Sequence, residues 1–258
     1  MTRSEAEKRS LSTLEKDVRR THPMPKARAA PLRRLLRTLS ALYPAIGYCQ
    51  GMNFVGSFCL ETAREREEDA FWLFATLVAR LGLLDMYAPG MRRLQLCFFQ
   101  LERLLLWHAP ALHEHLHALQ IVPELYATSW FVTLFTDFAL LPKRAVDELW
   151  DQIVARDGAP QQQWGLVFAT LLWLLDALTP CVAGEPFDVT LATLCRFPYE
   201  RVAAGRSVRE ILALSAARWE ASISMGEQLE LLSEEWLRGL AANPSEERAG
   251  RIAFDEED

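Results

Sequence analysis

The residue in this sequence whose surroundings most favour a chemical role is Gln50. It follows Tyr48 and Cys49, and the three are enclosed by Gly47 and Gly51, with apolar residues at helical spacing on both sides. Glycine adopts positive φ and allows another backbone or a ligand to come close. We therefore expect Gln50 on a tight turn at the start of a helix, with its amide directed at a group outside the chain. The alternative is a packed turn between helices in which Gln50 only caps a helix.

Asp17 and Arg20 form a second candidate, a carboxylate beside a guanidinium. They are three residues apart in a predicted helix, so they can face each other and the carboxylate can orient the guanidinium. The alternative is an ordinary surface ion pair, which contributes little to stability.

A histidine cluster is the third candidate. His113, Glu114 and His117 match the H-E-x-x-H pattern, in which two histidines on one helix face bind zinc and the glutamate acts as base. The segment is short, lies between Pro110 and Pro123, and has no evident third ligand, so we predict that it is not a metal site. A zinc hydrolase is the remote alternative. The sequence contains neither a G-x-x-x-x-G-K-[ST] loop nor a G-x-S-x-G elbow, so we do not expect it to bind its own nucleotide in that way.

The elements that must position these groups are predicted to be helices. Apolar residues repeat at helical spacing, and no alternating strand pattern of useful length occurs. We predict an all-α fold, a single large multi-helix domain of roughly a dozen helices with no significant β-sheet. The first expected helix is opened by a capping box at Ser12–Glu15 and ended by His22-Pro23, and Gly82 is expected to close a later one. A short helix is expected between Pro110 and Pro123, and one or two within 208–236. The other expected helices are 32–42, 71–81, 94–105, the apolar run 125–141, 142–158, 164–178 and 191–195.

Charge and domain limits follow from composition. Residues 1–40 hold eleven Lys/Arg against four Asp/Glu, whereas the whole chain of 258 residues has a net charge of −6. A basic segment can attract an anionic partner such as a phosphate or an acidic protein, although a solvated helix face is the simpler interpretation. We predict a flexible N-terminus over 1–10, a helical domain over 11–240 with its last helices at 206–240, and an acidic, disordered tail over 241–258.

The remaining composition indicates a reducing compartment. The five cysteines form no Cys-x-x-Cys pair and are expected to be buried free thiols. The N-terminus is polar, so no signal peptide is expected. The most apolar run, Leu166–Leu175, is too short to span a bilayer and is expected to be a buried core helix.

Together, the first two candidates resemble the finger motifs of the TBC-domain Rab GTPase-activating proteins. That family has Ile-x-x-Asp-x-x-Arg and then Tyr-x-Gln-Gly, and this chain has Leu14-x-x-Asp17-x-x-Arg20 and then Tyr48-Cys49-Gln50-Gly51. Further landmarks follow in family order over about residues 11–200: Glu68–Trp72, Ser129–Phe131 with Leu134-Phe135, and Leu149–Asp151. There are three departures: no early Arg/Trp motif, a short link from Arg20 to Gln50, and Glu148 where many members have arginine.

The resemblance implies a mechanism with two fingers. Arg20 would stabilise the negative charge that develops on the transferred phosphoryl group, and Gln50 would orient the attacking water in place of the GTPase's own glutamine. Asp17 would hold the Arg20 loop and Thr21 the turn after it. The Gln50 turn would be shaped by Tyr48, Gly51 and Asn53.

The resemblance also implies the partner and the setting. The partner would be a Rab-family GTPase in its GTP-bound state, which brings GTP and Mg²⁺, so the chain needs no cofactor or metal of its own and hydrolyses no nucleotide independently. Neither nucleic acid nor direct membrane insertion is expected. The protein would be cytoplasmic, act in vesicle trafficking and be recruited to endomembranes through its partner. A catalytically inactive TBC-type binding or scaffold module is the alternative.

Overall fold

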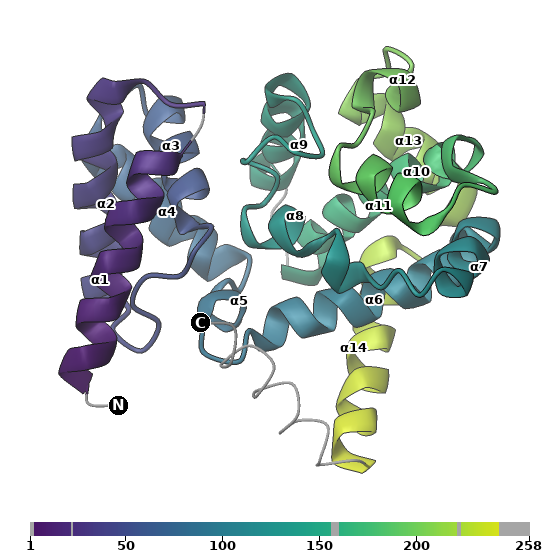
Figure 1. The fold of residues 1–258 in the computed structure, drawn as a ribbon, viewed down its shortest axis with the longest axis horizontal. Helices are drawn as coiled ribbons and strands as arrows, with labels where there is room; N and C mark the ends of the chain where they lie inside the picture. Colours follow the sequence, from purple (N-terminus) through teal and green to yellow (C-terminus); the bar gives the residue numbers. More distant parts are fainter. Residues whose placement is uncertain (1–2, 22, 156–159, 221–222, 243–258) are drawn as a thin grey trace. The chain divides into compact units, whose positions relative to one another are not determined.

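The protein is described by a computed structural model that covers residues 3–21, 23–155, 160–220 and 223–242. Within these ranges the chain forms fourteen α-helices and two short 3-10 helices, and no strand (Figure 1). This confirms the all-α fold predicted from the spacing of apolar residues. The chain divides into two compact units, Met1–Arg93 with Ser129–Asp137, and Leu94–Thr128 with Phe138–Asp258.

The first unit is a small bundle that carries both finger candidates. Helices α2, α3 and α4 pack against one another, and α1 packs on α2 and α3 (Figure 1). Leu14 and Val18 of α1 are fully buried, and so are Leu36 of α2 and Phe74 of α4. The elements are α1 (Arg3–Arg20), the 3-10 helix η1 (Lys26–Arg28), α2 (Ala29–Leu42), α3 (Met52–Thr62), α4 (Glu67–Arg80) and α5 (Leu84–Tyr87).

Helix α1 begins earlier than the sequence indicated. It starts at Arg3, so the predicted start at the Ser12 capping box is wrong, and residues 3–10, expected to be a flexible segment, continue the helix. Arg, Glu, Ala and Lys dominate this segment, and all four favour a helical backbone. The capping-box residues therefore lie inside a continuous helix, where no free N–H groups need a cap. The helix ends at Arg20, and the predicted stop residue His22 lies outside the described residues.

The link between α1 and α2 is fixed by a buried arginine. The Arg28 side chain is only 7% exposed, and its Nε and Nη2 donate to Oε1 of Glu65 at 2.8 and 2.6 Å. Its Nη1 donates to Glu61 Oε2 at 3.2 Å and to Ser57 Oγ at 3.3 Å. Because Ser57 and Glu61 belong to α3, the chain that follows Arg20 is attached to the helix that follows Gln50.

Replacing Arg28 is expected to destabilise the first unit. Arg28→Met removes donors from the buried Ser57 hydroxyl and from two carboxylates, at a cost of about 1–3 kcal/mol. Arg34→Met is the matched control, because Arg34 makes a similar pair with Glu67 on the exposed surface, where solvent screening leaves little net stabilisation. Urea unfolding followed by circular dichroism measures both. Equal losses in the two variants would contradict the structural role of Arg28.

The second unit is built around α10 (Pro160–Val182). This helix contacts α7, α9 and α11 to α14. By length and composition alone it could cross a membrane, but 67% of its apolar window is buried inside the structure, as expected for a core helix. It is longer than the apolar run Leu166–Leu175. The other elements that lie wholly or mostly in this unit are α6 (Arg92–His108), α7 (Pro110–Ala118), η2 (Pro123–Leu125), α9 (Lys143–Ala155), α11 (Phe187–Cys195), α12 (Tyr199–Ala203), α13 (Val208–Trp219) and α14 (Met225–Ala242).

The apolar run 125–141 is not the continuous helix that was predicted. Helix α8 spans only Thr128–Val132, and the backbone then passes through turns with positive φ at Leu134, Phe135 and Phe138. The hydroxyl of Thr133 donates to the carbonyl of Ser129, and that of Thr136 donates to the carbonyl of Thr133; such local bonds compete with helix continuation. The run is largely buried even so, because burial alone does not require a helix.

Most of the other predicted helix limits lie within about four residues of those observed, and the predicted end at Gly158 lies outside the described residues. The backbone after α4 turns at Gly82, whose φ of +62° confirms the predicted left-handed stop. The stretch 208–236 forms two helices, α13 and α14. Helix α14 ends at Ala242, and the rest of the predicted acidic tail, 243–258, lies outside the described residues.

Candidate functional site

Arg20 is exposed but anchored by a buried carboxylate. Its Nη2 lies 2.7 Å from Oδ1 of Asp17, and the side chains are 59% and 1% exposed respectively. The pair sits in the last turn of α1, where the predicted three-residue spacing brings the two side chains together. An ordinary surface pair would expose both partners, so that alternative does not describe Asp17. The arrangement leaves the outer part of the guanidinium accessible to an anion.

Tyr48 connects this pair to the Gln50 turn. Its hydroxyl lies 2.6 Å from Oδ2 of Asp17 and 3.1 Å from Oδ1 of Asn53. The hydroxyl has a single proton, and the charged, nearer Asp17 oxygen is the stronger acceptor. Burial, together with the adjacent Asp17, raises the pKa of Tyr48 well above its usual value, so the residue remains a neutral donor. One carboxylate thus holds Arg20 with one oxygen and Tyr48 with the other.

Asn53 and Thr21 close the network. The Thr21 hydroxyl donates to the carbonyl of Asp17 at 2.7 Å and accepts from Nδ2 of Asn53 at 2.9 Å. Oδ1 of Asn53 accepts from the backbone N–H of Gly51 at 3.1 Å. All five predicted supporting residues therefore lie in one buried cluster that joins the end of α1 to the start of α3.

Gln50 projects from the turn that this cluster supports. It is exposed and makes no side-chain hydrogen bond with any described residue. Gly51, not Gln50, occupies the N-cap position of α3, and no side chain caps that helix. The interpretation of Gln50 as a helix cap is therefore wrong. Its amide is available to a group outside the chain.

Gly51 is at a position that no other residue fits. Its φ is +103°, and a Cβ at this position would lie 2.4 Å from Cγ1 of Val132. The turn with Gln50 is therefore pressed against the segment 129–137 of the same unit. The neighbouring Tyr87 hydroxyl donates to the carbonyl of Val132 at 3.0 Å and helps to fix that segment.

Gly51→Ala is expected to damage both stability and the site. The strained φ and the contact with Val132 together cost about 2–5 kcal/mol. Gly82→Ala is the control, because Gly82 also has positive φ (+62°) but nothing lies within 4 Å of the added Cβ; its expected cost is about 1–2 kcal/mol. Thermal unfolding of both variants measures the difference. Similar losses would mean that close packing at Gly51 is unimportant.

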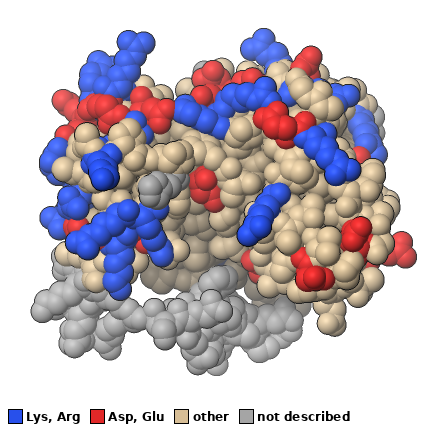
Figure 2. Space-filling model, turned by 45° about the horizontal axis from the view of Figure 1, so that its top comes forward, with Lys and Arg blue, Asp and Glu red and all other residues tan. Residues whose placement is uncertain are grey.

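The surface around Arg20 is basic. Figure 2 shows Lys and Arg side chains gathered over α1 and α2, beside a group of acidic side chains. The exposed basic residues of this region are Lys16, Arg19, Arg20, Lys26, Arg34 and Arg37. Arg34 and Arg37 are partly neutralised by Glu67 and Glu15. The net positive face suits an anionic ligand or an acidic partner surface.

Cys49, next to Gln50, is not set up as a nucleophile. Burial, and secondarily the charge of Asp17, raises its pKa to about 12, so the thiol remains protonated at neutral pH. All five cysteines are free in the structure, as the sequence predicted, but the predicted burial is complete only for Cys59 and Cys97, and Cys195 is exposed.

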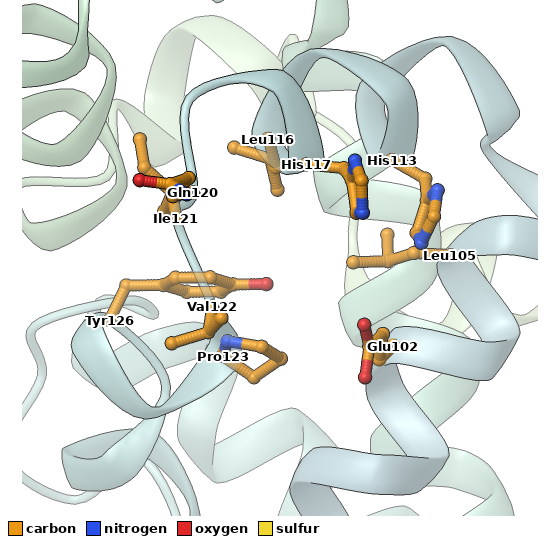
Figure 3. Close-up of a pocket in the computed structure, with 10 residues that line it drawn as sticks. All are labelled: Glu102, Leu105, His113, Leu116, His117, Gln120, Ile121, Val122, Pro123 and Tyr126. Atoms are coloured by element: carbon orange, nitrogen blue, oxygen red, sulfur yellow. The ribbon is translucent and has the colours of Figure 1, made fainter.

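The histidine cluster lines a cavity in the second unit. His113 and His117 of α7 stack with ring centroids 6.1 Å apart, and together with Glu102 they line one side of a cavity of about 360 Å³ (Figure 3). Tyr126 and Pro123 lie across this cavity. Among the described residues, no group of three His, Cys, Asp or Glu side chains is placed to hold a metal ion. The zinc alternative therefore has no geometric support.

Comparison with solved structures defines the fold. The chain matches the Ypt/Rab-GAP domain of Gyp1p with a TM-score of 0.66 over 87% of this chain and 74% of that one, at 17% identity. It matches the Chlamydomonas flagellar RabGAP TBC domain with a TM-score of 0.61 over 83% and 70% of the two chains, at 24% identity. The chain therefore has the helical TBC fold.

The sequence then gives the family. The model of the Rab-GTPase-TBC domain matches residues 1–177, and the chain belongs to this family. It is 39% identical over 122 residues to the GTPase-activating protein GYP5 of Eremothecium gossypii, covering 47% of this chain and 15% of that protein. It is 42% identical over 101 residues to TBC1 domain family member 4 of Mus musculus, covering 39% and 8%. The matches thus span only a small part of these longer relatives.

Three structural contributors escaped the sequence reasoning: Arg28, Val132 and Ser10. Each acts through a contact with a distant part of the chain, which for Ser10 is a hydrogen bond from the backbone N–H of Tyr48 to its Oγ at 3.0 Å. Arg28 showed no signal beyond its basic charge, and Val132 was hidden in an apolar run. Ser10 carried a possible signal, since it lies seven residues before Asp17 and therefore on the same face of a helix.

Proposed function

We propose that this chain stimulates GTP hydrolysis by a Rab-family GTPase, to which it supplies Arg20 and Gln50. The observation that carries the proposal is the shared anchor of the two side chains. Buried Asp17 contacts Arg20 and Tyr48, while Arg20 and Gln50 themselves remain exposed. Membership of the Rab-GTPase-TBC domain family supports the same activity and the same class of partner.

Each finger has a separate task in the proposed reaction. The Arg20 guanidinium stabilises the negative charge that builds on the phosphoryl oxygens as the bond to the leaving group weakens. The Gln50 carboxamide accepts a hydrogen bond from the attacking water with its oxygen and directs the water in line with that bond. The partner brings GTP and Mg²⁺. The chain's contribution is preorganisation, because the network around Asp17 holds the Arg20 guanidinium and the backbone of the Gln50 turn before the GTPase binds.

The setting belongs to the same proposal. The substrate is the GTP-bound Rab, and the protein acts in the cytoplasm on vesicle trafficking, reaching endomembranes through its partner. The basic face over α1 and α2 supports association with an anionic surface of the GTPase.

A hydrolysis screen tests the proposal. Purified protein is added to a panel of GTP-loaded Rab proteins, and phosphate release is followed under single-turnover conditions. At least one Rab should be stimulated by several orders of magnitude. A panel in which Rabs bind the protein but none is stimulated would favour the scaffold alternative over the catalytic one.

A further inference from the structure

We propose that Ser10 is a positioning residue for Gln50, because its hydroxyl fixes the backbone of the Gln50 turn to the helix that carries Arg20. The catalytic consequence rests on the proposed GTPase-activating function. The contact itself does not, and can be tested in the isolated protein.

The contact joins two segments 38 residues apart. The backbone N–H of Tyr48 donates to Oγ of Ser10 at 3.0 Å, and the same Oγ lies 3.5 Å from the carbonyl oxygen of Tyr48. One serine hydroxyl therefore meets both polar groups of a single residue's backbone. This bond holds the backbone amide of Tyr48, two residues before Gln50.

The neighbouring glycine is part of the same contact. Gly47 has a φ of +67°, and a Cβ there would lie 3.3 Å from Ser10 Oγ, tighter than an ordinary contact. A side chain at position 47 would therefore push the serine from the Tyr48 amide. The glycine before Tyr48 gives the turn its backbone angle and also lets the serine hydroxyl approach.

Ser10 and Asp17 hold Tyr48 at both ends. They are seven residues apart, two turns along the same face of α1, with the buried Leu14 between them. Asp17 accepts from the Tyr48 hydroxyl at 2.6 Å, while Ser10 accepts from its backbone. With two attachments, the turn can neither slide along α1 nor rotate about the tyrosine ring. Since Arg20 is on the same helix, α1 sets the position of Gln50 relative to Arg20.

Small displacements of a water-positioning group lower the reaction rate without necessarily weakening binding. Ser10→Ala removes the bond from the Tyr48 amide and the longer contact with the Tyr48 carbonyl, so we expect kcat for stimulated hydrolysis to fall about three- to tenfold, with KM for the Rab nearly unchanged. Ser10→Thr retains a hydroxyl and should recover most of this loss.

The control is Ser40→Ala. Ser40 is also a half-buried helical serine of the first unit, but its hydroxyl donates only to the carbonyl of Leu36 in its own helix. Ser40→Ala should therefore leave kcat unchanged. A further control introduces Ser10→Ala into the Gln50→Ala variant, with the protein in large excess over the Rab. There Ser10→Ala should cause no additional loss, because the group that it positions is already absent.

Amide hydrogen exchange completes the test without any GTPase. Exchange at the Tyr48 N–H should accelerate in Ser10→Ala but not in Ser10→Thr or Ser40→Ala. Unchanged exchange in Ser10→Ala would overturn the contact, whatever the Rab screen shows. Two results would overturn the positioning role. One is faster exchange in Ser10→Ala together with a wild-type kcat. The other is that Ser10→Ala lowers kcat equally in the wild-type and in the Gln50→Ala background.

Discussion

Arg20→Ala is expected to abolish nearly all stimulated hydrolysis. An arginine supplied in trans is worth about 10³–10⁵ in rate, so the loss should be of that order. Arg20→Lys should lose almost as much, because an ammonium is a point charge and cannot bridge two phosphate oxygens. Single-turnover phosphate release from the GTP-loaded Rab identified by the screen is the measurement.

The controls separate chemistry from folding. Arg20→Ala removes the cation beside the buried Asp17, so some loss of stability is expected, whereas Arg20→Lys keeps a positive charge there. Arg19→Ala is the matched variant, because Arg19 is the adjacent exposed arginine of the same helix. It should remain active. If the lysine variant retained near-wild-type stimulation, Arg20 would not be the finger.

Gln50→Ala should produce the second large effect, and it tests where the water-positioning amide comes from. If Gln50 supplies that amide, the switch glutamine of the Rab becomes largely dispensable. Wild-type protein should then stimulate a Rab whose switch glutamine is changed to alanine. Gln50→Ala should fail with both forms of the Rab, with a loss of at least about a hundredfold, since its contacts matter chiefly in the transition state.

Binding distinguishes this result from a damaged surface. Gln50 is exposed and makes no side-chain hydrogen bond with a described residue, so its loss should alter neither thermal stability nor affinity for the GTP-bound Rab by much. Two results together would contradict this role: no stimulation of the Rab whose switch glutamine is changed to alanine, and near-normal activity of Gln50→Ala. Gln50 would then be only a turn residue, and Arg20 would be the single finger.

Local patterns in the sequence predicted the parts of the site that depend on local geometry. The spacing of Asp17 and Arg20 on one helix face gave their contact, and the two glycines gave the special turn at Gln50. The all-α fold followed from periodicity, which reports which face of each helix is buried. These features depend on residues within a few positions of one another.

The errors arose where distant contacts or backbone turns decide the outcome. Residues 3–10 have no apolar stripe, so their helix was missed although their side chains favour one. The run 125–141 is buried, but burial does not distinguish a helix from the positive-φ turns at Leu134 and Phe135. The contacts of Ser10 with Tyr48 and of Gly51 with Val132 join segments far apart in sequence, which no single-sequence pattern records.

The two carboxylate oxygens of Asp17 have different partners, and this difference affects how Arg20 returns to its resting position after each reaction. Oδ2 accepts from Tyr48, but within the described part of the chain Oδ1 has no aligned hydrogen bond, and the Arg20 guanidinium 2.7 Å away is its close neighbour. An arginine that moves onto a phosphate therefore leaves a buried anion without its counterion. Once inorganic phosphate has departed, the attraction of that anion favours return of the guanidinium to one defined resting place. On the proposed mechanism, Asp17 would therefore act in product release and repeated turnover as well as in the initial orientation of the arginine.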